Sequence, residues 1–224
     1  MPIIRRRFLM ATPFLLGGCV GPAPRTASRS VLDPLSSYRE IYAEITTEPH
    51  PVPAVDPASL DPRFLRREVA YDTAEPPGTI VVDPGRRYAY LVREGGRALR
   101  YGIGTGREEA FNFQGEATVA RKAEWPRWTP TPDMIRREPA RYARFAGGLA
   151  GGADNPLGPR ALYLYRDGRD TLYRLHGTTE PWTIGTMVSS GCVRLLNQDI
   201  IDLYGRVPVG TRVVVLPAQA AASG

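Results

Sequence analysis

The sequence is poor in the residues that most often build reactive or metal-binding sites. It has two cysteines and two histidines among 224 residues, and Lys122 is its one lysine. Two cysteines exclude a framework of several disulfides, and no His, Cys and Asp cluster has the spacing of metal ligands. We therefore expect no metal and no other cofactor. Any chemistry based on a thiol or an imidazole must use one of very few residues.

Long hydrophobic runs are also absent. The apolar stretch 8–16 follows three arginines, residues 5–7, and is too short to span a bilayer as a helix. This order predicts an export signal that is removed. "RRRFLM" resembles the twin-arginine export pattern, and "LGGC" resembles the lipobox of bacterial lipoproteins. We expect 1–19 to be a signal peptide and Cys19 to be lipidated, so that the periplasmic protein is anchored to a membrane. The alternative is an ordinary cleaved signal in which Cys19 has no role.

Basic residues outnumber acidic ones by 29 to 23, which gives a formal net charge of +6. The arginines are scattered along the chain, and no nucleic-acid recognition motif accompanies them. We therefore expect no nucleic-acid partner. The length and the hydrophobic content of 42% suit one domain with a core, plus appendages.

The organisation of the chain follows from its composition. Residues 20–77 are rich in Pro, Ser and charge, which predicts a tether, with one short amphipathic helix where Leu35, Tyr38 and Ile41 recur at helical spacing. Short apolar segments separated by turns then predict a mostly β domain over 78–217. The last residues, 218–224, are expected to be a disordered tail.

Several elements of the β domain can be placed. Strands are expected at 79–83, 116–122 and 211–216, and hairpins at 88–104 and 160–177, the first turning at Gly95-Gly96 and the second at Asp167-Gly168. A helix should begin with Asn197 as its N-cap and end at Gly205. The Pro-, Gly- and Trp-rich stretch 125–157 is long and irregular, which is typical of a lid or a substrate-binding segment.

One short stretch, "VSSGCVRLLNQD" at 188–199, contains the second cysteine. A cysteine nucleophile needs a base, and His50 lies in the Pro-rich segment, so His176 is the candidate partner of Cys192. Gly191 would allow close backbone approach, and the amides of Gly191 and Cys192 are natural oxyanion donors. The residue types alone leave a buried structural cysteine and a hydrogen-bonded core histidine equally open.

The longer stretch "HGTTEPWTIGTMVSSGCVRLLNQDIIDLY" carries a resemblance. A histidine-glycine pair, a spacer, and then serine, a further residue, glycine, cysteine, an aliphatic residue and arginine resemble the active-site signature of the L,D-transpeptidase catalytic domain family (YkuD-type). The similarity extends over about 79–216. It implies a mostly β, sandwich- or barrel-like domain with a short helix after the catalytic cysteine.

The resemblance also implies a reaction and a set of roles. Cys192 would attack a peptidoglycan tetrapeptide stem, release D-alanine and pass the acyl group to an amine of the wall or of an outer-membrane protein. His176 would be base and then acid, the Gly177 carbonyl would orient its ring, and Gly191 and Cys192 would form the oxyanion hole. Arg194 would bind a substrate carboxylate or form a structural ion pair.

One position departs from the family pattern. Most members have a second histidine directly before the Gly-Cys pair, whereas this chain has Ser190, which leaves the bracing of the loop and the substrate preference open. Trp125 and Trp128 would line a substrate groove or pack the long loop. Two other functions stay open: an L,D-carboxypeptidase or amidase that uses water as acceptor, and a non-catalytic wall-binding lipoprotein.

Overall fold

The computed structural model describes residues 35–106, 113–189 and 192–217. These belong to one compact unit, residues 33–224. The expected signal peptide with Cys19, the expected tail and the two positions before Cys192 lie outside the described residues. Within the described ranges, no helix is both long enough and apolar enough to span a membrane.

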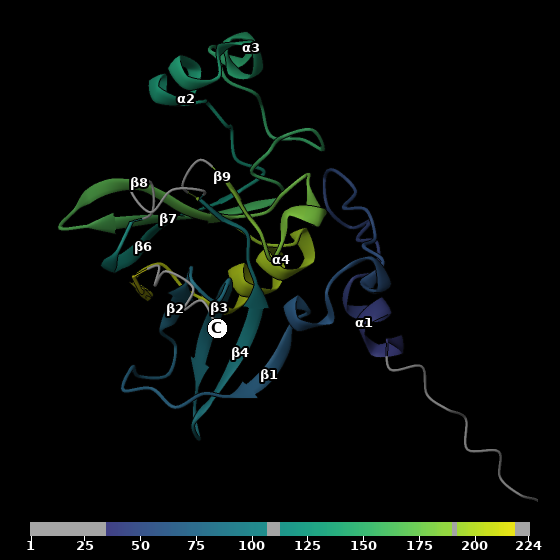
Figure 1. Cartoon of the computed structure of the whole chain (residues 1–224), viewed down its shortest axis with the longest axis vertical. Coiled ribbons are helices and arrows are strands. Elements are labelled where there is room, and N and C mark those ends of the chain that lie inside the picture. Colours follow the sequence, from purple (N-terminus) through teal and green to yellow (C-terminus); the bar gives the residue numbers. More distant parts are fainter. Residues whose placement is uncertain (1–34, 107–112, 190–191, 218–224) are drawn as a thin grey trace, which may run out of the picture. The chain divides into compact units, whose positions relative to one another are not determined.

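The fold is mostly β, as the sequence predicted, with α4 packed against the main sheet (Figure 1). In the described part, nine strands follow one another in the order β1-β4-β3-β2-β11-β6-β7-β8-β10, and β5 pairs separately with β9. The strands are β1 Arg67–Ala70, β2 Ile80–Asp83, β3 Tyr88–Arg93, β4 Arg97–Gly102, β5 Thr105–Gly106, β6 Gly115–Glu124, β7 Arg160–Arg166, β8 Arg169–His176, β9 Met187–Ser189, β10 Val193–Arg194 and β11 Arg212–Val215. The α-helices are α1 Ser36–Ile41, α2 Pro132–Arg137, α3 Pro139–Tyr142 and α4 Asn197–Arg206, with 3-10 turns η1 Pro57–Ser59, η2 Pro62–Phe64, η4 Ala143–Phe145 and η5 Pro181–Thr183.

Both predicted hairpins are present. Strands β3 and β4 pair antiparallel around Gly95 and Gly96, and both glycines have φ near +70°. Strands β7 and β8 pair antiparallel around Asp167 and Gly168, which also have positive φ. Glycine adopts this left-handed region without steric cost, which is why these short sequences could be read as turns.

Helix α4 closes the main core. Ile200 and Leu203 are fully buried in one cluster with residues of the sheet, such as Leu175 of β8 and Val193 of the end strand β10. The prediction of its ends was wrong in detail, because Asn197 is the first helical residue and makes no side-chain cap. Its amide oxygen instead accepts the backbone N–H of Thr178 at 2.8 Å. The helix also continues past the predicted stop, Gly205, to Arg206.

The stretch 125–157 is less irregular than its composition suggested. It holds α2, α3 and η4, and Figure 1 shows α2 and α3 standing beyond the strands. Thr131 begins α2, since its side chain accepts the Met134 N–H and a proline follows it at the first helical position. We refer to residues 126–154 as the lid.

The described part of the predicted tether, from residue 35 on, is folded. Residues 35–66, here the N-terminal segment, contain α1 at the place where helical spacing predicted a short helix. Tyr42, Val52, Phe64 and Leu65 of this segment are buried. The apolar residues between the prolines have a surface to pack on, which composition alone did not reveal.

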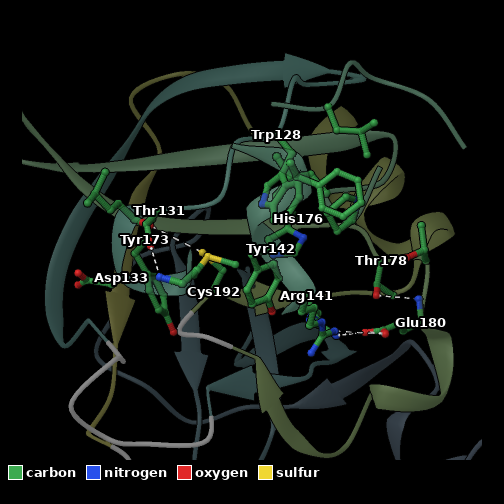
Figure 2. Close-up of a pocket in the computed structure, with 18 of the residues that line it drawn as sticks. Trp128, Thr131, Asp133, Arg141, Tyr142, Tyr173, His176, Thr178, Glu180 and Cys192 are labelled. Atoms are coloured by element: carbon green, nitrogen blue, oxygen red, sulfur yellow. Dashed lines mark hydrogen bonds and ion pairs between the residues drawn. The ribbon is translucent and has the colours of Figure 1, made fainter. Parts of the chain in front are cut away.

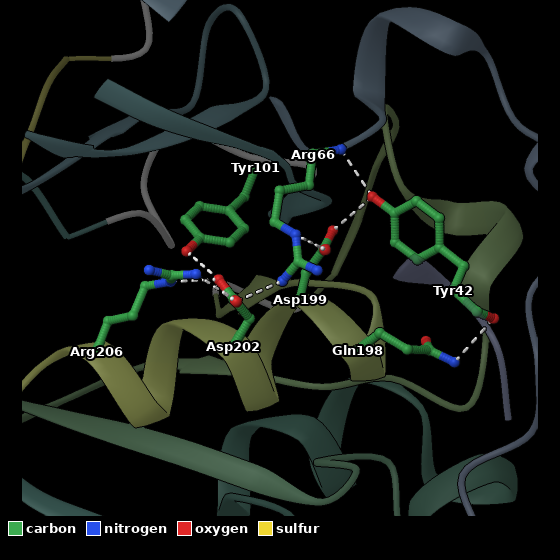
Figure 3. Close-up of polar contacts among 7 residues, drawn as sticks. All are labelled: Tyr42, Arg66, Tyr101, Gln198, Asp199, Asp202 and Arg206. Carbon is green, nitrogen blue, oxygen red and sulfur yellow. Dashed lines mark hydrogen bonds and ion pairs between the residues drawn. The ribbon is translucent and has the colours of Figure 1, made fainter. Parts of the chain in front are cut away.

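Polar contacts fix the N-terminal segment to α4 (Figure 3). The buried Tyr42 hydroxyl donates to the Asp199 carboxylate at 3.3 Å and accepts the Arg66 backbone N–H at 2.7 Å. The Gln198 side-chain amide donates to the Pro53 carbonyl at 2.9 Å. Burial, opposed by nearby Arg66, raises the pKa of Asp199 to about 7. The segment is therefore an integral part of the folded unit.

Candidate active site

Two strands bring the predicted nucleophile and base to one face. Strands β8 and β10 pair in parallel, with Arg194 opposite His176. The same register, taken two residues back, places Cys192 beside Arg174. Residues two apart on a strand share a face, and directly paired residues point to the same side. Cys192 and His176 are therefore diagonal neighbours on one face of the β8–β10 pair.

Cys192 contacts the backbone of β8 at an irregular point. Its Sγ lies 3.7 Å from the Leu172 carbonyl oxygen. Leu172 has φ of 59°, unusual for a residue with a side chain, and its side chain is exposed. Next to this point the register between β7 and β8 shifts. The irregular backbone thus turns a carbonyl toward the thiol instead of completing a regular ladder.

His176 ends β8 with a defined ring orientation. It is buried, and its Nδ1 lies 2.6 Å from the Gly177 carbonyl oxygen. A carbonyl only accepts hydrogen bonds, so Nδ1 carries the proton and Nε2 is left with a lone pair. Gly177 has no room for a side chain, because a Cβ there would collide with the Asn197 amide oxygen. The sequence that follows His176 therefore prepares Nε2 to take a proton.

Burial sets the charge of both groups. It lowers the pKa of His176 to about 3, with the nearby Arg194 charge acting in the same direction. Burial also raises the pKa of the Cys192 thiol, against the opposing effects of Arg174 and Arg194. Near neutral pH the site therefore holds a neutral thiol and a neutral imidazole, not a preformed thiolate.

A cavity of about 540 Å³ contains both groups on its wall (Figure 2). The lid supplies aromatic and apolar side chains to it, among them Trp128, Tyr142 and Phe145. Strand β8 supplies Leu172 and Tyr173. The charged lining residues are Asp133, Arg137, Arg141, Arg144, Asp154, Glu180 and Arg194. The cavity therefore combines an apolar wall, an excess of arginine and the candidate nucleophile.

Arg194 lies on this wall in an ion pair. Its Nη1 is 2.5 Å from Glu180 Oε2, and its side chain is 13% exposed. Arg141 of the lid approaches the other oxygen of the same carboxylate at 3.7 Å. Of the two roles considered for Arg194, the structure shows the ion pair, which links the loop after His176 to β10.

The two tryptophans differ in their surroundings. Trp128 lines the cavity and packs edge-on against Tyr142 and Phe145, with ring centroids 6.1 and 5.6 Å away. Trp125, by contrast, is not among the residues described at the cavity wall, and its indole N–H donates to Glu48 at 2.9 Å. The expectation that Trp125 lines the groove is thus corrected.

Two of the predicted site residues lie outside the described part of the chain, and two residues that were not predicted line the cavity. Gly191 and Ser190 lie outside the described residues, as does the proposed oxyanion hole in its glycine part. Leu172 and Glu180 line the cavity and were not predicted, because neither a positive φ at a leucine nor a glutamate in a loop has a sequence signature. Among the described residues, no three His, Cys, Asp or Glu side chains gather as a metal site would require.

Comparison with known proteins gives a consistent family. The family model described as the L,D-transpeptidase catalytic domain matches residues 77–215. The Escherichia coli (strain K12) protein described as "Probable L,D-transpeptidase ErfK/SrfK" is 45% identical over 116 residues, which cover 51% of this chain and 35% of that protein. A candidate L,D-transpeptidase encoded in the ATP synthase subunits region of Fuscovulum blasticum is 34% identical over 146 residues, covering 65% of this chain and 72% of that protein.

The matches to the Escherichia coli relatives cover only part of those proteins. The chain spans about a third of the length of the Escherichia coli relatives. A crystal structure from Brucella melitensis, described as a probable carnitine operon oxidoreductase, is 52% identical and covers 72% of this chain and 99% of that one, with a TM-score of 0.48. That score is too low for the superposition to say more about this chain.

The buried imidazole predicts a pH-dependent difference in stability. Unfolded chains take up a proton on His176 below about pH 6.5, whereas the folded protein does so only near pH 3. Stability that is present above pH 6.5 is therefore lost as the pH falls toward 3. Relative to the His176→Gln variant, wild type should lose about 2 kcal/mol of unfolding free energy from pH 7 to pH 5, measured by urea denaturation.

The comparison with a variant is needed because Asp199 acts in the opposite direction. Its raised pKa, about 7, makes stability fall as the pH rises from about 4 to 7. This effect cancels in the difference between wild type and variant. His50→Gln, at the other histidine, serves as the control. A gap between wild type and His176→Gln that stays constant between pH 5 and pH 7 would contradict burial of a neutral imidazole.

Proposed function

The chain belongs to the L,D-transpeptidase catalytic domain family, and we propose that it is a peptidoglycan L,D-transpeptidase whose nucleophile is Cys192. The observation that carries this proposal is the placement of Cys192 and His176 on one face of paired strands, at the wall of one cavity. The Nδ1 contact with Gly177 adds to it, because this contact leaves Nε2 free to act as a base.

The first step is acylation. As Sγ attacks the carbonyl carbon of the third residue of a tetrapeptide stem, a diaminopimelate, Nε2 takes the thiol proton. The neutral resting pair means that this transfer accompanies the attack. The imidazolium then gives the proton to the departing D-alanine amine as the C–N bond breaks. A thioester on Cys192 and a neutral imidazole remain.

The second step resolves the thioester. An acceptor amine attacks the thioester carbonyl, Nε2 takes a proton from that amine, and the proton passes to Sγ as the C–S bond breaks. The products are a new amide and the restored thiol. An amine of another stem gives a wall crosslink, and an amine of an outer-membrane protein gives attachment of that protein to the wall. With water as the acceptor, the same step gives an L,D-carboxypeptidase.

The cavity lining fits a stem peptide. Four arginines and three acidic residues line the cavity, and Arg194 is already paired with Glu180. Arginines of the lid are suited to the carboxylates that a stem peptide carries, since a guanidinium can bind a carboxylate with two hydrogen bonds. Trp128 offers an apolar face against which a stem can lie.

The location is proposed from the sequence. Export and a lipid on Cys19 would hold the enzyme in the periplasm, on a membrane and beside its substrate. A Cys19→Ser variant should move from the membrane fraction to the soluble fraction after cell lysis. A mature N-terminus found elsewhere by mass spectrometry would contradict the lipobox reading.

The products of the purified protein distinguish the three functions. Incubated with tetrapeptide-stem muropeptides, a transpeptidase yields crosslinked dimers, a carboxypeptidase yields trimmed tripeptide stems, and a non-catalytic binder yields no change in the mass spectrum.

We expect crosslinked dimers. Cys192→Ala and His176→Ala should each abolish them, and the double variant should be no worse than either single one, because the two residues act as one unit. Cys19→Ser, which removes the other cysteine, should keep the activity; product formation by Cys192→Ala would overturn the proposal.

A further inference from the structure

The two ends of the lid, where the chain leaves the β domain and returns to it, are joined by hydrogen bonds. Trp128 and Leu149 exchange two backbone hydrogen bonds, at 2.9 and 2.7 Å. The buried Asn155 amide donates to the carbonyls of Pro126 and Ala150, both at 2.9 Å. These contacts hold the two ends of the lid together. We call this point, where Pro126, Ala150 and Asn155 meet, the lid root. The position of the lid over the cavity depends on where the lid root is fixed.

Trp125 stands at that root in an unusual conformation. Its φ is 42°, in the left-handed region that residues with large side chains rarely adopt. The Trp125 backbone N–H donates to the Pro159 carbonyl at 2.8 Å. Gly151 lies so close that a Cβ on it would collide with the Trp125 carbonyl oxygen. Such a conformation persists only where the surroundings hold it in place.

The surroundings that hold Trp125 come from the N-terminal segment. Glu48 Oε2 accepts the Trp125 indole N–H at 2.9 Å. The same carboxylate accepts two hydrogen bonds from Arg160 at the start of β7, at 2.9 and 2.6 Å. The His50 ring packs edge-on against the indole, with centroids 4.8 Å apart. One carboxylate therefore joins the lid root to the sheet.

The environment of this carboxylate makes the contact strong. Arg160 is 7% exposed and the Glu48 side chain is 12% exposed, so solvent screens their interaction little. Burial opposes ionisation of Glu48, but the hydrogen bonds from Arg160 and Trp125 outweigh it and lower the pKa of the carboxyl group. Charge-assisted hydrogen bonds of this kind are about twice as strong as neutral ones.

We propose that Glu48 is a positioning residue that fixes the lid root, so that the N-terminal segment forms part of the substrate-binding unit. Glu48 precedes residues 77–215, which the family model matches, so the feature lies outside the shared catalytic domain. The lid contributes Trp128, Tyr142 and Phe145 to the cavity wall, and a displaced root would move all three together. The proposal depends on the proposed function only for the identity of the ligand, a stem peptide.

The test uses Glu48→Gln, which keeps the shape of the side chain and removes its charge. Glu44→Gln is the matched control, because Glu44 lies four residues earlier and is exposed. Hydrogen exchange in residues 126–154 should be faster in Glu48→Gln than in wild type and Glu44→Gln, with exchange in the central strands unchanged. With a tetrapeptide stem, KM should rise on the order of tenfold while kcat is largely retained, as expected for loss of one charge-assisted contact.

A second variant keeps the proposal testable if Glu48→Gln folds poorly. Trp125→Phe removes the indole donor without a charge change, and it should speed lid exchange in the same way. The double variant should be little worse than the worse single variant, since both changes break one contact. Lid exchange and KM equal to those of Glu44→Gln would overturn the proposal. A wild type without turnover would instead contradict the proposed function, and lid exchange alone would then decide the role of Glu48.

Discussion

The parallel pairing of β8 with β10 is the constraint on which the site depends. It brings together His176 and Cys192, which are 16 positions apart in the sequence, and it determines the face of the sheet on which each side chain lies. Gly104 holds β10 from the other side through two backbone hydrogen bonds with Arg194, both at 2.9 Å. A Cβ at Gly104 would lie 2.8 Å from the Thr183 carbonyl oxygen, so this close approach needs glycine. A short strand of two residues is thereby held on both edges, and the nucleophile directly precedes it.

The same enclosure determines the chemistry that the pair can do. The buried imidazole, near Arg194 and Arg174, resists protonation, and the partly buried thiol resists ionisation, so neither charge is present before a substrate enters. A thiolate and an imidazolium form by proton transfer from Sγ to Nε2 only while Sγ attacks a substrate carbonyl. Such a thiol reacts slowly with electrophiles other than the substrate. The bound ligand and the lid exclude water from the site during the reaction.

The sequence predicted what short-range chemistry controls and missed what long-range packing controls. Turn glycines identified both hairpins, and the scarcity of histidine and cysteine reduced the candidate pair to His176 and Cys192. The role of the N-terminal segment was hidden, because Tyr42 and Asp199 meet across 157 positions and prolines between the apolar residues suggested an extended chain. Trp125 misled for a similar reason: an aromatic residue in a long loop suits a groove, and only its contact with Glu48 shows that it belongs to the root of the lid.

Cys192 rests as a neutral thiol on the same face of the sheet as a neutral imidazole. The pH dependence of its alkylation by iodoacetamide, followed by peptide mass spectrometry so that Cys19 is scored separately, tests this most directly, because alkylation requires the thiolate. We expect slow alkylation throughout the range from about pH 5 to pH 8, with a rate that rises only above the ordinary pKa of a thiol, about 8.5. Fast alkylation that is already constant from about pH 5 upward would reveal a preformed thiolate-imidazolium pair and rule out a neutral resting thiol.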